Sequence, residues 1–415
     1  MELRTPRGMR DFMPAQMNAR NAVISVVERV FRRYGYEPLE TPALENMEIL
    51  DVKCGEDTNK QIYRVEDGKL GMRFDLTVPL ARVVASNQSL PKPFKRYCIG
   101  KVWRREEPQK GRFREFLQAD VDIIGSSKME CDAELLACAS ECLKKLGFKD
   151  FRIRVNNRKI LDSIITGVGI TAASAAVFRT LDKLEKIGEK GVNDELVEMG
   201  VGKDSVKKLM EIISQKGDNE EILKNVGGYG ENGIRELEEL VALCNTYCLE
   251  NVSVDLSLVR GLDYYTGPVF EISAGGGVGS IAGGGRYDNL IGVYSGVDVP
   301  AVGISLGIER IMALLGEGDE KSCVEICIAA VKPEFYPNAI AVAQELRASG
   351  MNVQVDLMGR NLRKQFDYAN SKKIMFIGVI GQREAEKDMI TVRNLETGEE
   401  KVVSPKEVRK IVWGE

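Results

Sequence analysis

Arginines in unusual surroundings are the residues of this sequence best suited to chemistry. Arg104 and Arg112 lie between Lys92 and Arg114, a stretch with nine basic and two acidic residues, a net charge of +7. A guanidinium group stays charged and donates hydrogen bonds in one plane, a geometry suited to phosphate. Phe113 and Phe116 offer rings that can stack on a base. A solvated charged hairpin is the alternative, but the rings and the return to apolar residues speak against it.

Arg260 stands alone in an otherwise apolar, strand-like stretch from Leu258 to Gly267, beside two tyrosines. A buried arginine is costly unless a counter-charge pairs with it. The sequence leaves two partners open, Asp263 and an anionic ligand. Arg310 falls on a helix that we expect to begin near Ser305, where an exposed helix arginine is the ordinary alternative.

Three consecutive glycines, Gly283 to Gly285, allow a ligand or a neighbouring strand to approach the backbone closely, although a plain turn is the commoner explanation. The run from Gly277 to Ala282 matches a dinucleotide-binding glycine pattern, but no strand–turn–helix–strand unit surrounds it, so we reject that match. The chain contains no histidine. Ser-His-Asp catalysis and zinc sites with imidazole ligands are therefore excluded. Any general base must be a carboxylate, a lysine, a tyrosine or the substrate itself.

The elements that must position these residues follow an α+β pattern. Hydrophobic spacing and turn residues predict the elements. They are a helix over 15–35, a hairpin over 62–75 with its turn at Asp67-Gly68, strands over 96–104 and 116–124, a helix over 131–146, mainly helices over 171–250, and strands with glycines over 252–310. An alternating β and α pattern follows a polar break at 316–322.

This organisation predicts three regions. We expect a core formed by residues 1–170 and 251–318, a helical insertion at 171–250, and a separate α/β domain at 319–415. The length of 415 residues is sufficient for two to three domains.

The composition of the chain indicates where in the cell the protein is expected. No apolar run approaches the roughly 18 residues of a membrane helix, and the charged N-terminus lacks a signal peptide's apolar core, so we expect a cytoplasmic protein without membrane contact. Nine cysteines, an odd number, fit reduced thiols better than a disulfide framework. The pair Cys244 and Cys248, expected on one helix, and the pair Cys323 and Cys327, expected on one strand, are interpreted as small apolar residues. The net charge of −4 means that a nucleic acid would have to bind at local basic patches.

Taken together, these stretches resemble the motifs of class II aminoacyl-tRNA synthetases, and of histidyl-tRNA synthetases in particular. Residues 104–118 resemble motif 2, residues 300–310 resemble motif 3, and residues 36–45 resemble motif 1 of the dimer interface. The stretches 258–265 and 283–288 resemble two segments peculiar to the histidine enzymes. The run Gln118-Ala-Asp-Val-Asp122 resembles the archaeal and eukaryotic branch. The resemblance extends from Thr5 to the C-terminal unit.

The resemblance implies an antiparallel class II sheet flanked by helices, with a helical insertion that clamps the tRNA acceptor stem and a C-terminal α/β anticodon-binding domain. It implies a homodimeric, ATP-dependent ligase. This enzyme would convert L-histidine and ATP to histidyl-adenylate and pyrophosphate, then transfer histidine to the 3′ end of tRNA(His). Mg²⁺ would accompany the ATP phosphates, and its protein ligands are unknown.

The resemblance also implies roles for individual residues. Arg104 and Arg260 would be catalytic, the first holding the α-phosphate and the second bridging it to the histidine carboxylate. ATP binding is implied for Arg104, Glu106, Arg112, Phe116 and Arg310. Histidine binding is implied for Asp75, Thr77, Gln118, Asp122, Arg260, Tyr264 and Tyr265. Contact with the tRNA acceptor end is implied for Gln109, Lys110 and Arg112.

Two alternatives stay open. One is the non-catalytic regulatory paralogue of ATP phosphoribosyltransferase, a family that typically lacks the C-terminal domain and loses key arginines. The other is another class II synthetase, for proline or threonine. The four arginines and the C-terminal unit speak against the first, and Arg260 with the 283–288 segment speaks against the second.

Overall fold

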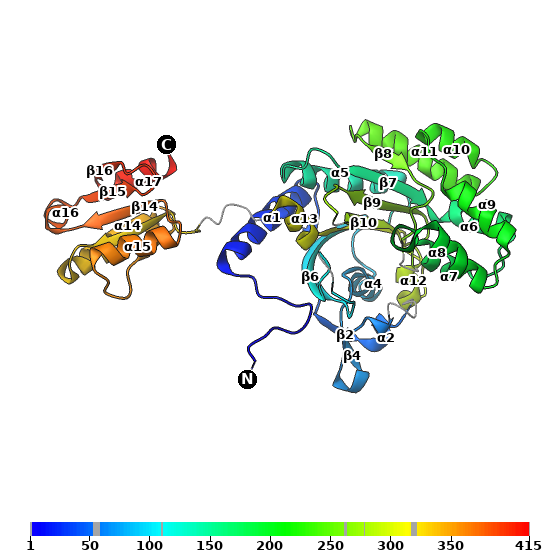
Figure 1. Ribbon diagram of the computed structural model, residues 1–415, viewed down its shortest axis with the longest axis horizontal. Coiled ribbons are helices and arrows are strands. Elements are labelled where there is room, and N and C mark those ends of the chain that lie inside the picture. Colours follow the sequence, from blue (N-terminus) through cyan, green and yellow to red (C-terminus); the bar gives the residue numbers. More distant parts are fainter. Residues whose placement is uncertain are drawn as a thin grey trace. The chain divides into compact units, whose positions relative to one another are not determined.

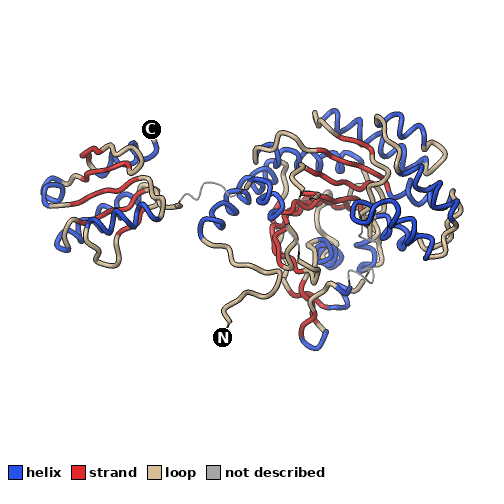
Figure 2. Tube along the Cα trace, viewed as in Figure 1, coloured by secondary structure: helices blue, strands red, loops and turns tan. Residues whose placement is uncertain are grey.

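The computed structural model describes residues 2–52, 59–108, 111–260, 264–277, 279–316 and 322–414. The chain forms two compact units. One comprises Met1–Asp11 and Ala22–Gly316, and the other comprises Phe12–Asn21 and Glu317–Glu415. Figures 1 and 2 show the helices and strands of each unit.

The larger unit is built on an eight-stranded sheet with the strand order β1-β5-β6-β11-β10-β9-β7-β8. Its strands are β1 (Glu37–Pro38), β5 (Phe94–Trp103), β6 (Glu115–Ile124), β7 (Arg152–Asn157), β8 (Val252–Val254), β9 (Pro268–Ser273), β10 (Ser280–Arg286) and β11 (Ala301–Gly307). The outermost pair at each edge is parallel, and the pairs between them are antiparallel. The expected antiparallel sheet flanked by helices is confirmed.

Helices cover this sheet because their apolar residues recur at helical spacing. The covering helices include α1 (Pro14–Arg33), α5 (Met129–Lys145), α6 (Arg158–Gly167) and α13 (Ile308–Leu315). In α1, Val27 and Phe31 are fully buried one turn apart. In α5, Ala133 and Ala137 are nearly or fully buried, and their small side chains allow the helix to pack closely against the sheet.

A second, smaller layer of short strands and helices also belongs to the larger unit. It consists of a three-stranded sheet of β2 (Leu44–Asn46), β4 (Leu70–Met72) and β3 (Arg64–Val65), with α2 (Met47–Leu50), η1 (Glu66–Gly68), α4 (Thr77–Ser86) and α12 (Leu290–Ser295). The expected hairpin is present, and its turn contains Asp67 and Gly68 at positive φ angles of 53° and 86°.

Five helices fill the segment between α6 and β8, as the sequence predicted, and the last two of them contact β7 or β8 (Figure 1). They are α7 (Ser174–Leu181), α8 (Leu184–Glu198), α9 (Lys203–Ile213), α10 (Asn219–Asn225) and α11 (Glu231–Thr246). Gly188 interrupts α8 with a φ of 70°, a conformation that glycine adopts without steric cost.

The C-terminal part of the second unit is a five-stranded sheet with the order β13-β12-β14-β15-β16. Its elements are β12 (Ile326–Ala330), η2 (Pro333–Phe335), α14 (Tyr336–Ala348), β13 (Val353–Val355), α15 (Leu362–Ser371), β14 (Phe376–Ile380), α16 (Gln382–Lys387), β15 (Ile390–Asn394), β16 (Glu400–Val403) and α17 (Pro405–Trp413). Every expected strand and helix is present. The short helix α16 was not anticipated, because its five polar or charged residues and single alanine carry no apolar periodicity.

Four local expectations were wrong. Ser305 lies in strand β11, and the helix begins at Ile308, because Ser305 pairs with Asp120 of β6. Residues 258–260 form no strand, since Asp255 to Ser257 begin a turn after β8. Cys248 lies beyond the end of α11, and Cys323 lies before β12; both are exposed, whereas their partners Cys244 and Cys327 are buried.

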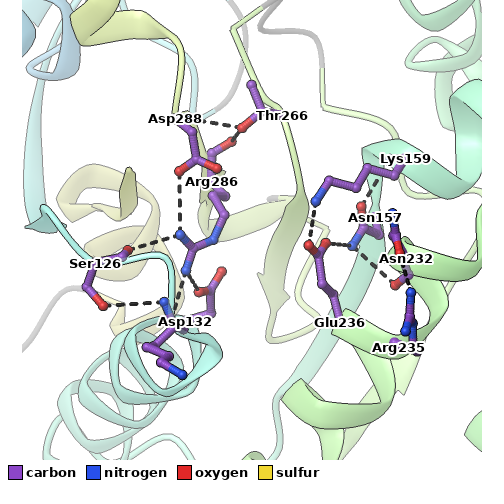
Figure 3. Close-up of polar contacts among 12 residues, drawn as sticks. Ser126, Asp132, Asn157, Lys159, Asn232, Arg235, Glu236, Thr266, Arg286 and Asp288 are labelled. Carbon is purple, nitrogen blue, oxygen red and sulfur yellow. Dashed lines mark hydrogen bonds and ion pairs between the residues drawn. The ribbon is translucent and has the colours of Figure 1, made fainter. Parts of the chain in front are cut away.

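Arg286 joins the end of β10 to the start of α5 (Figure 3). Its side chain is 2% exposed and forms an ion pair with the fully buried Asp132. The guanidinium group also donates to the carbonyl oxygens of Ser126, at 3.1 Å, and Lys128, at 2.9 Å. The Asp288 carboxylate lies 3.4 Å from it. Arg286 therefore ties the end of β10 to the start of α5, and its guanidinium group is engaged within the protein.

A second network, also drawn in Figure 3, fixes α11 to the start of α6. The Asn157 side chain accepts from the backbone N–H of Lys159 at 3.0 Å and so caps α6. Its amide group donates to Glu236 of α11 at 2.7 Å. Lys159 pairs with the same carboxylate. The helical segment is thereby anchored to β7.

No helix in the part of the chain that the structure describes is both long enough and apolar enough to cross a bilayer.

Replacing Arg286 with alanine should leave Asp132 as a buried charge without its partner. Breaking a buried pair in this way costs roughly 3–5 kcal/mol of unfolding free energy. Urea unfolding followed by circular dichroism measures the loss. Arg33→Ala is the control, because its pair with Glu141 leaves 54% of the arginine side chain exposed and exposed pairs contribute at most about 1 kcal/mol. Equal losses in the two variants would contradict a structural role for Arg286.

Candidate active site

Strand β6 places three polar side chains on one face of the central sheet. Gln118, Asp120 and Asp122 alternate with apolar residues, and successive side chains of a strand point to opposite faces. The register brings Ser305 of β11 opposite Asp120 and Gly303 opposite Asp122. Polar residues from segments that are distant in the sequence therefore meet on one surface.

Glycines on the neighbouring strands leave the space that these side chains occupy. A Cβ atom on Gly303 would overlap the Asp122 carboxylate, and one on Gly283 would overlap the Arg260 guanidinium group. A Cβ atom on Gly285 would lie 2.9 Å from the Tyr265 ring. The glycine run is thus a central strand that admits close neighbours, and it is not a plain turn.

A small pocket opens on this surface. Its lining residues come from β6, β11, β10 and the residue after it, the start of α4 and the segment before it, and the segment before β9. They are Asp75, Thr77, Gln118, Asp120, Asp122, Tyr264, Tyr265, Gly283, Gly284, Tyr287, Gly303, Ile304 and Ser305. Six of the seven residues predicted to bind histidine line it, and the seventh, Arg260, lies over Gly283 at its edge.

Asp122 is held firmly at one end of the pocket. One carboxylate oxygen lies 2.9 Å from Nη2 of Arg96, and the two side chains are 2% and 1% exposed. The other oxygen accepts the hydroxyl proton of Tyr287. Burial raises the pKa of Asp122, and the charge of Arg96 opposes that rise.

Asp75 forms another wall together with Tyr264. The carboxylate accepts from the backbone N–H of Val78 at 3.0 Å and from the Tyr264 hydroxyl at 3.3 Å. Burial raises the pKa of Asp75. The rings of Tyr264 and Tyr265 meet edge to face, with centroids 5.1 Å apart. Tyr264 meets Tyr287 in the same way at 6.0 Å, so three tyrosines form one rigid aromatic wall.

Asp120 lies within electrostatic reach of both carboxyl groups. It is 3% exposed. Burial raises the pKa of Asp120 to about 7, and a hydrogen bond from Ser305 partly offsets that rise. The Gln118 amide donates to the Ser305 hydroxyl at 2.6 Å, so Gln118, Ser305 and Asp120 form a connected chain.

Arg260 has a partner that neither alternative from the sequence anticipated. Its Nη1 lies 3.2 Å from the Glu271 carboxylate of β9, and its side chain is 24% exposed. Asp263, the partner considered from the sequence, lies outside the described residues. Glu271 also pairs with Arg154 of β7, and Arg154 lies 2.8 Å from Glu185 of α8. Arg260 is therefore positioned by a carboxylate that it shares with a second guanidinium group.

The other predicted arginines are held mainly by backbone carbonyl groups, which leave their positive charge in place. Arg104 donates to the carbonyl oxygen of Phe74 at 3.0 Å, and its guanidinium carbon lies 5.2 Å from the centroid of the Phe116 ring. Arg310 donates to the carbonyl oxygen of Ser280. Arg112 lies 3.6 Å from the Glu106 carboxylate.

The four arginines lie within electrostatic reach of one another. Burial lowers the pKa of Arg310, and the charges of Arg112, Arg260 and Arg104 lower it further. Four like charges in one partly buried region are unfavourable in themselves. An anion that bound among them would relieve the repulsion. Such a region can therefore bind a polyphosphate.

Two of the remaining predicted residues, Gln109 and Lys110, lie outside the described residues. The ring of Phe113, expected to stack on a base, has the guanidinium carbon of Arg10 4.0 Å from its centroid. The segment around Arg104 is anchored at its base, where the Arg104 N–H donates to the Arg114 carbonyl oxygen at 2.9 Å.

Four residues of the site were not predicted from the sequence: Asp120, Tyr287, Ser305 and Glu271. One signal could have found Asp120, because Gln118, Asp120 and Asp122 recur at every second position in a strand that is otherwise apolar. The other three depend on strand register, which the sequence alone does not reveal.

The profile of the family described as "Histidyl-tRNA synthetase" matches residues 8–311, and the profile described as "Anticodon binding domain" matches residues 325–413. These two matches leave only short segments unassigned.

Relatives of known name agree with both profiles. The chain is 44% identical to the protein named histidine–tRNA ligase of Aeropyrum pernix, across 99% of this chain and 97% of that one. It is 42% identical to the protein of the same name from Korarchaeum cryptofilum, across 93% of each chain. The crystal structure of histidyl-tRNA synthetase from Nostoc sp. PCC 7120 superposes with a TM-score of 0.85 at 29% identity, covering 100% of this chain and 99% of that one. The chain belongs to the histidyl-tRNA synthetase family.

Proposed function

We propose that this protein is a histidine–tRNA ligase. It activates L-histidine with ATP, forming histidyl-adenylate and pyrophosphate, and then transfers histidine to the 3′ end of its tRNA. The family membership and the names of the relatives support this function.

The observation that carries the proposal is the convergence of four arginines beside a pocket lined with carboxyl groups. Arg104, Arg112 and Arg260 all lower the pKa of Arg310 through their charges. The pocket beside them is lined by Asp75, Asp120 and Asp122. A polyphosphate fits the first environment, and an amino acid with a positively charged group fits the second.

In the activation step, a carboxylate oxygen of histidine attacks the α-phosphorus of ATP. A C–O–P linkage forms, the bond from the α-phosphorus to the bridging oxygen breaks, and pyrophosphate leaves. Both reactants are anions, so the attack requires charge screening. Arg260 supplies it between the carboxylate and the α-phosphate, and Arg104 supplies it at the α-phosphate. Because Glu271 and the Phe74 carbonyl group hold these side chains, the cations are in place before the reaction begins.

The rest of the nucleotide extends over the neighbouring residues. Arg112 and Arg310 steady the β- and γ-phosphates. Phe116 stacks on adenine, and Glu106 faces the adenine end. Alignment of the two reactants accounts for much of the remaining rate.

Histidine is recognised at both ends. Asp75, Thr77 and Gln118 hold the α-ammonium group, while Asp122 and one of the tyrosines Tyr264 and Tyr265 contact the imidazole ring. A site that hydrogen-bonds a polar substrate group rejects analogues without that group by roughly 10⁴–10⁵-fold.

Mg²⁺ accompanies the ATP in this proposal. Glu106 is paired with Arg112, and Glu271 with Arg260, so neither is a dedicated metal ligand. Among the described residues there is no group of three or more cysteine, aspartate and glutamate side chains that could hold an ion. The phosphates would therefore supply most of the oxygen ligands, as Mg²⁺ sites on nucleotides commonly do. The ion would neutralise phosphate charge when bound.

We assign the tRNA contacts by region. Residues 319–415 bind the anticodon, the helical insertion at 171–250 clamps the acceptor stem, and residues 1–170 with 251–318 form the catalytic core. Gln109, Lys110 and Arg112 face the acceptor end. The segment from Tyr36 to Glu45 contributes to a homodimer interface.

The alternative of a non-catalytic regulatory paralogue is not favoured. The C-terminal stretch matches the anticodon-binding profile. The relatives at 44% and 42% identity are named as ligases.

The direct test of the function is ATP–pyrophosphate exchange. Histidine should support exchange in the presence of Mg²⁺, whereas proline and threonine should not. Exchange that depends on another amino acid, with none for histidine, would refute the assignment.

Arg260→Ala should lower the exchange rate by at least about 10²–10³-fold, the usual effect of removing one preorganised donor to a developing anion. The variant should keep its fold, because the arginine contacts Glu271 at the rim of the pocket. Circular dichroism checks the fold, and Arg33→Ala serves as the control. Near-normal exchange in the Arg260 variant would remove this residue from the mechanism.

Gly283→Ala should reproduce much of that defect without removing any charge. The added Cβ atom would occupy the position of the Arg260 guanidinium group and displace it. Gly228→Ala is the matched control, since nothing lies within 4 Å of a Cβ atom there. The rates of ATP–pyrophosphate exchange by the two variants test this prediction. If the Gly283 variant matched the control, the position of Arg260 described here would be wrong.

A further inference from the structure

The polar hydrogens around the pocket are mostly donated within the protein. The Tyr264 hydroxyl donates to Asp75 at 3.3 Å, and the Tyr287 hydroxyl donates to Asp122. The Gln118 amide donates to Ser305 at 2.6 Å. These groups consequently present lone pairs to a ligand, and the pocket is rich in hydrogen-bond acceptors.

Two of those acceptors are left without a donor. Oε1 of Gln118 and Oδ1 of Asp120 are buried and have no hydrogen-bond partner among the described residues. Buried polar atoms of folded proteins almost always have a partner. Both residues line the pocket. The missing donors are therefore expected to come from the ligand.

The charges around Asp120 are unbalanced. Three carboxyl groups line the pocket, and Arg96 pairs with one of them, Asp122, at 2.9 Å. Arg73 is engaged by the carbonyl oxygens of Thr41 and Lys101. Asp120 thus has no counter-ion of its own among the described residues.

Titratable groups face Asp120 from every neighbouring element. They are Arg96 and Cys98 on β5, Asp122 on β6, Arg73 and Asp75 between β4 and α4, Tyr265 before β9, and Tyr287 after β10. Burial has the largest effect and raises the pKa of Asp120 to about 7. Arg96 lowers this pKa, whereas Asp122 and Asp75 raise it.

We propose that Asp120 and the imidazole ring of bound histidine share one proton, through a hydrogen bond between Oδ1 and a ring nitrogen. Asp120 is then a residue that determines specificity for histidine, in addition to Asp122. The inference rests on the proposed function and identifies how its amino-acid site recognises the ring.

The reason is electrostatic. An ionised Asp120 beside a neutral ring would leave a buried charge without compensation, which is costly. A carboxylate paired with an imidazolium ion, or a carboxylic acid paired with a neutral imidazole, contains the same single proton and avoids that cost. The α-ammonium group of histidine meanwhile compensates Asp75.

Calorimetric titration of histidine into the full chain tests this directly. Buffers of different ionisation enthalpy reveal how many protons accompany binding. Free Asp120 has a pKa of about 7, and a free imidazole has a pKa of about 6.5. At pH 8 both free groups have lost their protons, so binding should take up nearly one proton. At pH 6 both free groups are mostly protonated, so binding should release a fraction of one proton.

The Asp120→Asn variant should show little of the proton uptake that accompanies histidine binding at pH 8. Its KM for histidine should rise more than its KM for ATP. Asp162→Asn is the matched control, because burial also raises the pKa of that carboxyl group and it lies outside the pocket. The control should bind histidine with the same proton uptake as the natural protein.

Nuclear magnetic resonance gives a second readout that needs no variant. The chain contains no histidine, so every imidazole signal belongs to the ligand. The ring ¹⁵N shifts of histidine bound at pH 8 should show that the two ring nitrogens are protonated or strongly hydrogen-bonded.

The outcomes separate the two proposals. Histidine that binds at pH 8 without proton uptake, or full uptake by the Asp120 variant, would overturn the shared proton and leave the ligase function intact. No binding of histidine by the natural protein under any condition would instead refute the function itself.

Discussion

Repulsion among like charges is the constraint on which the rest of this structure depends. Four like charges on flexible segments would simply move apart, and here the charges of Arg104, Arg112 and Arg260 lower the pKa of Arg310. Two of them are tied to backbone carbonyl groups of Phe74 and Ser280. These carbonyl groups direct the side chains without cancelling their charge. The antiparallel sheet supplies the rigidity that keeps the cations together.

The sheet performs this task through its register and its glycines. Residues that oppose one another across β6 and β11 belong to segments more than 150 positions apart, and β10 pairs with the other edge of β11, so the three strands form one continuous surface. Gly303 leaves room on that surface for Asp122, and Gly283 leaves room for Arg260. Two residues of β10 have different tasks: Gly283 makes room for Arg260, and Arg286 ties the strand to α5.

The sequence predicted the architecture well, because hydrophobic spacing is a local property. The hairpin around Asp67, the two long strands beside the charged loop and the alternating C-terminal unit all followed from it. The pairing of Arg260 with Glu271 did not, because it depends on how a loop folds over a strand. The strand through Ser305 was mistaken for a helix, since a short apolar run fits either structure until its neighbours are known. Asp120 was not predicted for a different reason, because the family motif indicates Asp122 as the histidine-binding residue of this strand.

One carboxylate links regions that the sequence keeps apart. Glu271 serves both Arg260 at the pocket and Arg154, and Arg154 also contacts Glu185 of the helical segment. A single negative charge divided between two cations binds each less strongly than it would bind one alone. The helical segment consequently belongs to the electrostatic environment of Arg260, although none of its described residues lines the pocket. Cutting the chain at the borders of that segment would therefore alter the field at the edge of the pocket as well as remove a group of helices.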